Sequence, residues 1–210
     1  MYPIHYFRMY KVKEIFYTLQ GEGHHSGRPA VFCRFTGCNL WSGQERHRSS
    51  SICQFCDTDF IGGDTFSREE LVNKINSTWK GQGNKFVVFT GGEPALQLDE
   101  ALVEEVKDHG FTTAVETNGT RQLPDNLDWI TVSPKAYTQL VITQGNEVKV
   151  VYPQIGINPH DFQSLNFEHY YIQPMDGFMR LNNTNKAIEY CLGNTHWQLS
   201  TQVHKRVGIR

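Results

Sequence analysis

The feature that most constrains the fold is an alternation of strand-like and helix-like segments along most of the 210-residue chain. Runs rich in β-branched and aromatic residues predict strands at residues 11–20, 30–35, 85–90, 111–117, 129–134, 146–152, 169–174 and 196–204. Helical patterns lie between some of them, at residues 67–79, 94–109 and 184–192. This repetition predicts an α/β fold, in which a parallel sheet has helices packed outside it.

Local signals support the helices. Ser67 followed by Glu70 is a capping-box pattern, in which each side chain accepts a hydrogen bond from the backbone N–H of the other residue. Pro94 suits the start of a helix that runs to about His109, because its missing N–H would have no helical partner there. The third helical pattern ends at Gly193, which suits a helix C-terminus.

Composition favours a single domain over residues 1–210. A chain of this length with 39% hydrophobic residues buries one sizeable core and is short for two. The net charge of −2 gives no general attraction to nucleic acid or to a membrane surface. No run reaches the roughly 20 apolar residues of a membrane span, and residues 1–14 lack a signal-peptide pattern. A cytoplasmic location, where thiols stay reduced, is therefore expected.

Five polar motifs follow predicted strands. They are QGEG, the cysteine cluster, GGEP, ETNGT and SPK. In parallel α/β sheets and barrels the chemistry takes place at the carboxyl ends of the strands. We therefore expect these motifs to lie together at one end of the sheet and to line a single site.

Three of the five cysteines cluster in one loop, as Cys38, Cys53 and Cys56. Three thiolates can bind three irons of a [4Fe–4S] cluster and leave the fourth iron open for reaction. The fourteen-residue spacer, residues 39–52, is a polar insertion that we expect to bulge from the surface. Its length costs little, because the entropy of loop closure grows only logarithmically.

Cys33 offers a competing interpretation of the same loop. With it the pattern becomes C-x4-C, fourteen residues and C-x2-C, which is close to a four-cysteine structural zinc site. Against this, Cys33 lies in an apolar strand, where a small buried thiol is common. We expect Cys33 to belong to the core, and Cys191, on a helix with apolar neighbours, likewise.

The combination RFTGCNL…CQFCDT with TGGEP resembles the radical S-adenosylmethionine (SAM) enzymes, apart from the first spacer, which is usually three residues. Seven motifs in order, YTLQGEG, RFTGCNL, CDT, TGGEP, ETNGT, SPK and QVHK, resemble the 7-carboxy-7-deazaguanine synthase family across nearly the whole chain. The resemblance implies a partial (β/α)6 TIM-like barrel with trimmed helices. It also implies the ring contraction of 6-carboxytetrahydropterin with loss of ammonia, in queuosine biosynthesis.

The resemblance further implies a [4Fe–4S] cluster on Cys38, Cys53 and Cys56, Mg²⁺ on Thr58, and SAM that acts catalytically through a 5′-deoxyadenosyl radical. No catalytic side chain is implied beyond these cofactors. Glycines let a backbone approach SAM closely, and Glu93 suits its ammonium group. The SAM contacts implied by the family are Phe55, Cys56, Asp57, Gly92, Glu93, Glu116, Ser133, Lys135 and Gln173.

For the substrate, a pterin carboxylate calls for a cation, and the planar fork of Arg34 suits it. The family pattern implies substrate contacts from Leu19, Gln20, Gly21, Arg34, Thr90 and His204. His24 and His25 match no family position and are expected at the surface. Lys205 and Arg206 are expected in a solvated C-terminal end.

The implied partners are a flavodoxin- or ferredoxin-like electron donor and a second copy of the chain, which would cover the edges of a trimmed barrel. Two other functions remain in view. One is a radical SAM activating enzyme that abstracts hydrogen from a glycine of a partner protein. The other is a zinc-binding module for RNA, against which the near-neutral charge counts.

Overall fold

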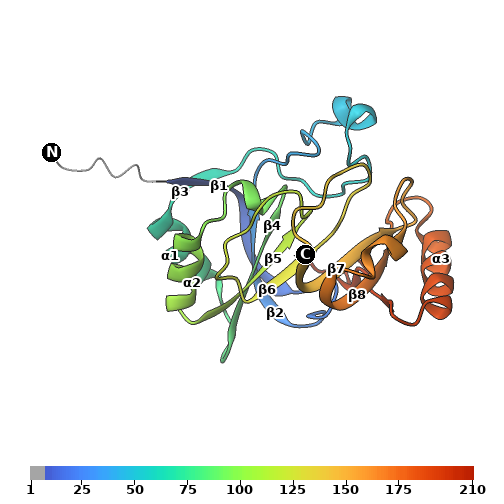
Figure 1. The fold of residues 1–210 in the computed structure, drawn as a ribbon. Coiled ribbons are helices and arrows are strands. Elements are labelled where there is room, and N and C mark those ends of the chain that lie inside the picture. The colour runs from blue at the N-terminus through green and yellow to red at the C-terminus, as the bar shows by residue number, and fades with distance from the viewer. Residues whose placement is uncertain (1–7) are drawn as a thin grey trace.

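The computed structural model describes residues 8–210 and contains one nine-stranded sheet with helices on its outer side (Figure 1). Residues 1–7, which include half of the segment inspected for a signal peptide, lie outside the described residues. Among residues 8–210, no helix is long and apolar enough to cross a bilayer. The predicted α/β class is confirmed by this sheet, which is parallel over most of its strands.

The strands lie in the order β3-β1-β2-β4-β5-β6-β7-β8-β9. They are β1 (Met9–Leu19), β2 (Pro29–Phe35), β3 (Asp64–Ser67), β4 (Lys85–Gly91), β5 (Phe111–Thr117), β6 (Trp129–Val132), β7 (Gln144–Tyr152), β8 (Asn166–Pro174) and β9 (Gln198–Leu199). All pairs from β2 to β9 are parallel, whereas β1 is antiparallel to both β2 and β3.

The sheet is rolled so that its two ends meet. Val203 N, beyond β9, donates a hydrogen bond of 2.9 Å to Gly21 O, just beyond β1. Gly23 N donates to Ser200 Oγ at 2.9 Å. Because β1 and β9 lie far apart in the strand order, these contacts require the sheet to curve into a partial barrel.

Three longer helices cover the outer face, and a short helix ends the chain. They are α1 (Arg68–Thr78), α2 (Glu100–Asp108), α3 (Arg180–Gly193) and α4 (Val203–Val207). Helices α1 and α2 pack on β1, β2, β4 and β5 in one buried apolar cluster, and α3 packs on β7 and β8 in a second. Figure 1 shows α1 and α2 together, with α3 at the opposite end of the sheet. The inner face of the sheet remains available to line the candidate functional site.

Two predicted elements were wrong. Pro94 starts a 3-10 turn, Pro94–Leu96, and α2 begins only at Glu100, because the Asp99 side chain caps it by accepting from Leu102 N. The predicted strand at 196–204 is reduced to Gln198–Leu199, since the chain then turns inward and forms α4. Strand β3 was not predicted; it adds to the edge of β1.

The position of QGEG also differs from prediction. Leu19 at the end of β1 pairs with Pro29 at the start of β2, so β1 runs against the parallel strands. QGEG therefore starts near their amino ends and passes into the barrel, while the other four motifs lie toward the carboxyl ends.

Removing the capping box of α1 is expected to destabilise the protein. Ser67 Oγ accepts from Glu70 N, and Glu70 Oε2 accepts from Ser67 N at 2.7 Å. Ser67→Ala should lower the free energy of unfolding by about 1 kcal/mol in urea denaturation. Ser77→Ala, near the other end of the same helix, removes a hydroxyl that bonds only Lys74 O and should change little. Equal losses in the two variants would contradict the capping role.

Candidate functional site

Two adjoining cavities occupy the inner side of the sheet. The cysteine cavity, of about 200 Å³, contains most of the residues expected to contact the cluster and SAM: Cys38, Cys53, Phe55, Cys56, Asp57, Gly92, Glu116, Ser133, Lys135 and Gln173. The arginine cavity, of about 180 Å³, contains all those expected to contact the substrate: Leu19, Gln20, Gly21, Arg34, Thr90 and His204. The two cavities share a wall made of Glu22, Asp57, Thr58, Thr90, Glu116 and Gln202.

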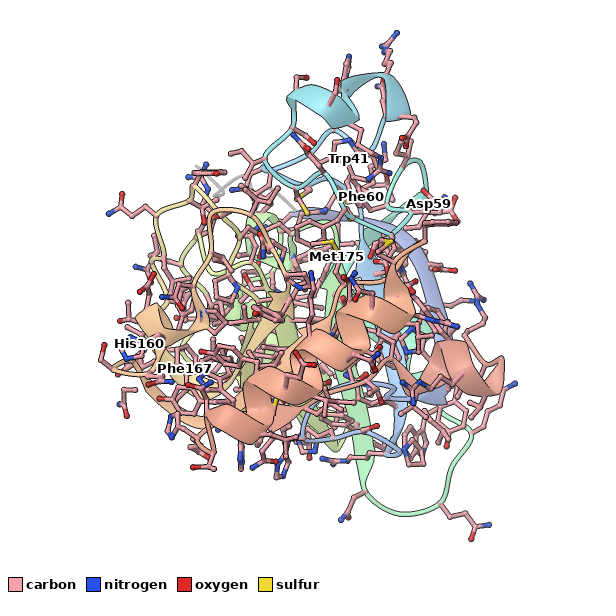
Figure 2. The ribbon with its side chains drawn as sticks, turned by 90° about the vertical axis from the view of Figure 1, so that its right-hand side faces the viewer. Trp41, Asp59, Phe60, His160, Phe167 and Met175 are labelled. Carbon is pink, nitrogen blue, oxygen red and sulfur yellow. The ribbon has the colours of Figure 1, made fainter. Side chains whose placement is uncertain are left out.

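The cysteine loop forms a small apolar cluster of its own. Cys53 is buried among Leu40, Trp41 and Phe60, and Cys38, Phe55 and Cys56 pack against this group. Figure 2 shows Trp41 and Phe60 at one end of the molecule, with Met175 beneath them. A hydrogen bond between the two thiols lowers the pKa of Cys56 and raises that of Cys53.

Cys33 lies on the other face of the sheet. It is fully buried in the apolar cluster beneath α1 and α2, and this burial raises the pKa of its thiol. A four-cysteine zinc site would need Cys33 beside Cys38, which this position prevents. Among residues 8–210, no three His, Cys, Asp or Glu residues are spaced for a single metal ion. Three thiols that line one cavity instead fit a larger group with several irons.

Most of residues 42–52 are exposed, as expected of an insertion, whereas Leu40 and Trp41 are buried, and the Arg48 side chain anchors the exposed part. Arg48 Nη1 donates to Gln54 O at 2.9 Å and to Cys56 O at 3.0 Å. Its guanidinium also lies over the Trp41 ring, 4.2 Å from the centroid. The insertion thus braces the backbone that carries Cys53 and Cys56.

Glu93 was expected to contact SAM. Its side chain is fully buried and does not line the cysteine cavity. The carboxylate accepts from Thr117 Oγ1 at 2.6 Å, Asn118 N at 2.8 Å and Ala95 N at 3.0 Å. Because these donors come from the two neighbouring strand ends, the Glu93 carboxylate holds GGEP against ETNGT.

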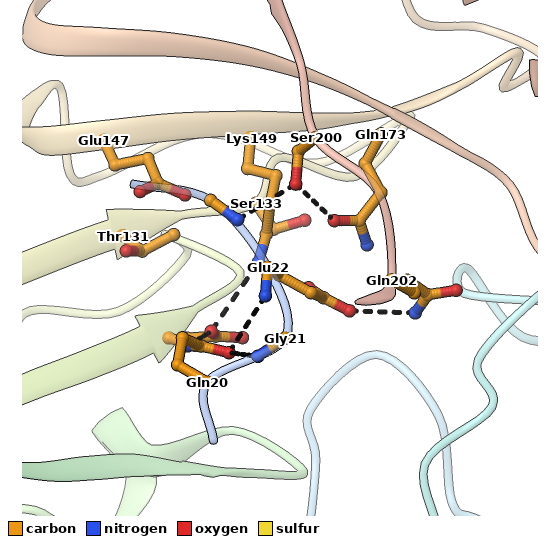
Figure 3. Close-up of polar contacts among 12 residues, drawn as sticks. Gln20, Gly21, Glu22, Thr131, Ser133, Glu147, Lys149, Gln173, Ser200 and Gln202 are labelled. Atoms are coloured by element: carbon orange, nitrogen blue, oxygen red, sulfur yellow. Dashed lines mark hydrogen bonds and ion pairs between the residues drawn. The ribbon is translucent and has the colours of Figure 1, made fainter. Parts of the chain in front are cut away.

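A buried lysine, not singled out from the sequence, organises the shared wall. Lys149 Nζ donates to Glu22 Oε2 at 2.6 Å and lies 3.6 Å from Glu116 Oε1, which also accepts from Gln20 Nε2 at 2.8 Å (Figure 3). Burial raises the pKa of Glu22, but the ammonium and hydrogen bond of Lys149 outweigh it and bring the pKa to about 2. A charged residue inside the apolar strand NEVKVVY was the signal that could have identified Lys149.

The C-terminal tail is part of the site and not only a solvated end. Lys205 pairs with Asp57 in the cysteine loop and with Asp176 after β8, the second pair at 2.6 Å. Burial lowers the pKa of Lys205, but these two carboxylates outweigh it and raise the pKa above its usual value. Arg206 is exposed, as expected.

The histidines of the GEGHHSG turn were expected at the surface, which is correct only for His24. Its exposed ring stacks on His169, with centroids 4.1 Å apart. His25 is partly buried against Trp129, and burial together with the Arg28 charge lowers its pKa to about 4. Both rings pack at the amino-end side of the barrel, away from the cysteines.

Comparison with known proteins identifies relatives of the whole chain. The Radical SAM superfamily model matches residues 47–153. The chain is 52% identical to a 7-carboxy-7-deazaguanine synthase of Bradyrhizobium diazoefficiens, over 96% of this chain and 99% of that protein. It is also 52% identical to the protein of that name from Burkholderia multivorans, over 95% and 99%. The crystal structure of QueE from Escherichia coli, 27% identical, superposes with a TM-score of 0.72 over 93% of this chain and 95% of that one.

Loss of the Lys205 ion pairs is expected to loosen the cysteine loop. Both pairs are partly exposed, so together they contribute only about 1 kcal/mol. Lys205→Met should therefore speed cleavage of residues 53–60 by a nonspecific protease roughly fivefold. Arg206→Met, one residue away and exposed, should leave cleavage there unchanged. A similar increase in both variants would mean that the tail acts through its fold and not through Lys205.

Proposed function

The chain belongs to the 7-carboxy-7-deazaguanine synthase family of the radical SAM superfamily, and on this premise we propose how its residues divide the work of the reaction. The protein is a ring-contracting lyase that converts 6-carboxytetrahydropterin to 7-carboxy-7-deazaguanine in queuosine biosynthesis. It uses a [4Fe–4S] cluster and SAM. A glycyl-radical activating function is set aside, because relatives at about half identity carry the synthase name.

The observation that carries the assignment of residues is the pair of adjoining cavities. We propose that Cys38, Cys53 and Cys56 bind the cluster and that SAM lies beside it, against Gly92, Ser133, Lys135 and Gln173. Bound there, the cluster and SAM supply the one-electron chemistry that removes a hydrogen atom from the substrate. Phe55 and Trp41 in the same wall shield the cysteine loop from water.

The substrate is proposed to lie in the arginine cavity, with its carboxylate on Arg34. Arg34 Nε is 3.0 Å from Glu14 Oε1, yet it is buried and makes no hydrogen bond within residues 8–210. A donor in that condition gains from a bidentate anionic ligand. Leu19, Gln20, Gly21, Thr90 and His204 line the same cavity and offer backbone, amide, hydroxyl and imidazole groups to the heterocycle.

Thr58 is proposed as the protein ligand of Mg²⁺. It lies in the wall shared by the two cavities, between the proposed sites of SAM and substrate. Mg²⁺ keeps several waters and needs few protein ligands, so one hydroxyl with substrate oxygens is sufficient. Asp57 is paired with Lys205 and is proposed to hold the loop beside SAM.

Four broader proposals complete the assignment. Residues 1–210 act as one domain with 39–52 as an insertion in the cysteine loop, and the enzyme works in the cytoplasm as a homodimer. Exposed apolar side chains on and beside α3, among them Phe178, Leu181 and Leu192, support a covered surface there. The electron donor is proposed to be flavodoxin- or ferredoxin-like, since cluster reduction needs one electron at a time.

The function is tested by turnover without oxygen. Reconstituted protein with SAM, reductant and 6-carboxytetrahydropterin should form 7-carboxy-7-deazaguanine and one ammonia per product, while SAM is recovered. Mass spectrometry of the product and an ammonia assay check both. Consumption of SAM without a new heterocycle would contradict ring contraction.

The cysteine assignment predicts different fates for two neighbouring substitutions. Cys38→Ala should lose the brown colour and most of the roughly four irons that a [4Fe–4S] cluster holds. Cys33→Ala should keep both, because Cys33 faces the helices. Optical spectra with iron and sulfide analysis of both variants are the measurement. A colourless wild-type protein that holds one zinc, lost in Cys33→Ala with the fold intact by circular dichroism, would restore the four-cysteine zinc interpretation.

A further inference from the structure

The shared wall contains a carboxylate, the glutamate of the QGEG motif, that has no role in the proposed site. The six residues of that wall lie between the proposed sites of SAM and substrate, so on that assignment the reacting atoms meet beside them. Three of the six are acids. Asp57 is ion-paired with Lys205, and Glu116 was expected to contact SAM. Glu22 is the third, and it lines both cavities.

Glu22 is held as a charged acceptor. Its Oε2 accepts from Lys149 Nζ at 2.6 Å and its Oε1 from Gln202 Nε2 at 2.9 Å (Figure 3). The Lys149 side chain is 4% exposed and that of Glu22 14%. Each carboxylate oxygen has about two acceptor sites, so one on each remains after these bonds. An ionised carboxylate in a nearly dry wall is a strong acceptor for N–H groups.

The backbone around Glu22 is fixed. Gly21 N and Glu22 N both donate to Gln20 Oε1, and Gly23 N donates to Ser200 Oγ. Gly23 has a φ of +63°, and a Cβ there would lie 2.1 Å from Glu147 Oε1. The turn therefore needs glycine at this position, which leaves Glu22 little freedom to point elsewhere.

We propose that Glu22 binds the N–H donors of the reduced pterin and that Lys149 is a positioning residue, which keeps the Glu22 carboxylate charged and aimed at the shared wall. This inference rests on the proposed function. Arg34 and Glu22 both line the arginine cavity, so the substrate carboxylate is held by a cation and its N–H groups by an anion. Such a pair of opposite charges fixes the orientation of the ring relative to the radical source.

The charge of Glu22 depends on several neighbours. Lys149 and Glu147 come from β7, Glu116 from β5 and His204 from α4. Of these, Lys149 and His204 lower the pKa of Glu22, while burial raises it. Without Lys149, the effect of burial on the pKa of Glu22 is no longer offset by the lysine ammonium group. The pKa of Glu22 should therefore rise. Activity that requires ionised Glu22 would then be lost at a higher pH than in the wild type.

The test uses the reconstituted enzyme and three variants. Glu22→Gln should raise KM for 6-carboxytetrahydropterin by about 30-fold, the loss expected for hydrogen bonds to a charged group. The Kd for SAM and the substrate-free cleavage of SAM by dithionite-reduced enzyme should stay within about twofold of wild type. Lys149→Met should lower kcat/KM similarly and move its acid limb up by at least about one pH unit. Lys107→Met, which removes a 2.6 Å ion pair to Asp128 away from both cavities, is the control and should match the wild type.

The following results would overturn the proposal or the function on which it rests. A wild-type KM in Glu22→Gln would overturn the substrate contact. Equal loss of SAM binding and substrate binding in Glu22→Gln would assign the pair a structural role, and this too would overturn the proposal. An acid limb that stays in place in Lys149→Met would overturn the positioning role. A wild-type enzyme that forms no 7-carboxy-7-deazaguanine would instead reject the proposed function, whatever the variants do.

Discussion

Contact between the two ends of the rolled sheet is the constraint on which the site depends. The turn after β1 and the tail after β9 meet through Val203 N to Gly21 O and Gly23 N to Ser200 Oγ. Both segments supply walls of the arginine cavity, so this closure creates the cavity as well as the barrel. The tail then reaches the cysteine loop through Lys205 and Asp57, which ties the second cavity to the same closure.

Closure of the rolled sheet also explains why several charged side chains can remain in its interior. Glu116 and Glu147, on the inner face of β5 and β7, and Glu22, in the turn after β1, all lie near Lys149, whereas the outer faces of β5 and β7 are apolar. Removing one partner of a buried ion pair typically costs about 3–5 kcal/mol, because the remaining charge stays buried without compensation. These groups are therefore stable only while the turn after β1 brings Glu22 to β7. The fold retains this polar interior where an apolar one would be more stable, which is typical of a binding site.

Alternation along β2 separates structural from reactive chemistry. Cys33 and Arg34 are adjacent, so their side chains point to opposite faces of the sheet. Cys33 enters the core beneath the helices, while Arg34 lines the cavity. The strand then ends, and Cys38 follows in the loop on the cavity side. Strand β2 therefore holds Cys33 away from a four-cysteine zinc site. The same strand supplies Arg34, a proposed substrate ligand, and leads into the loop that carries Cys38.

The sequence by itself determined the α/β class with most of its elements, the capping box of α1 and the family, and the family resemblance implied most of the residues that line each cavity. The elements follow from local periodicity, and the resemblance rests on motifs whose residues are close along the chain. Only the tertiary structure decided the reversed direction of β1, the inward burial of Glu93, and the partners of Lys149 and Lys205. Lys149 meets Glu22 across 127 positions and Lys205 meets Asp57 across 148. Local patterns specify which face of a strand is buried, but not which distant charge will face it, because that depends on how the sheet rolls and closes.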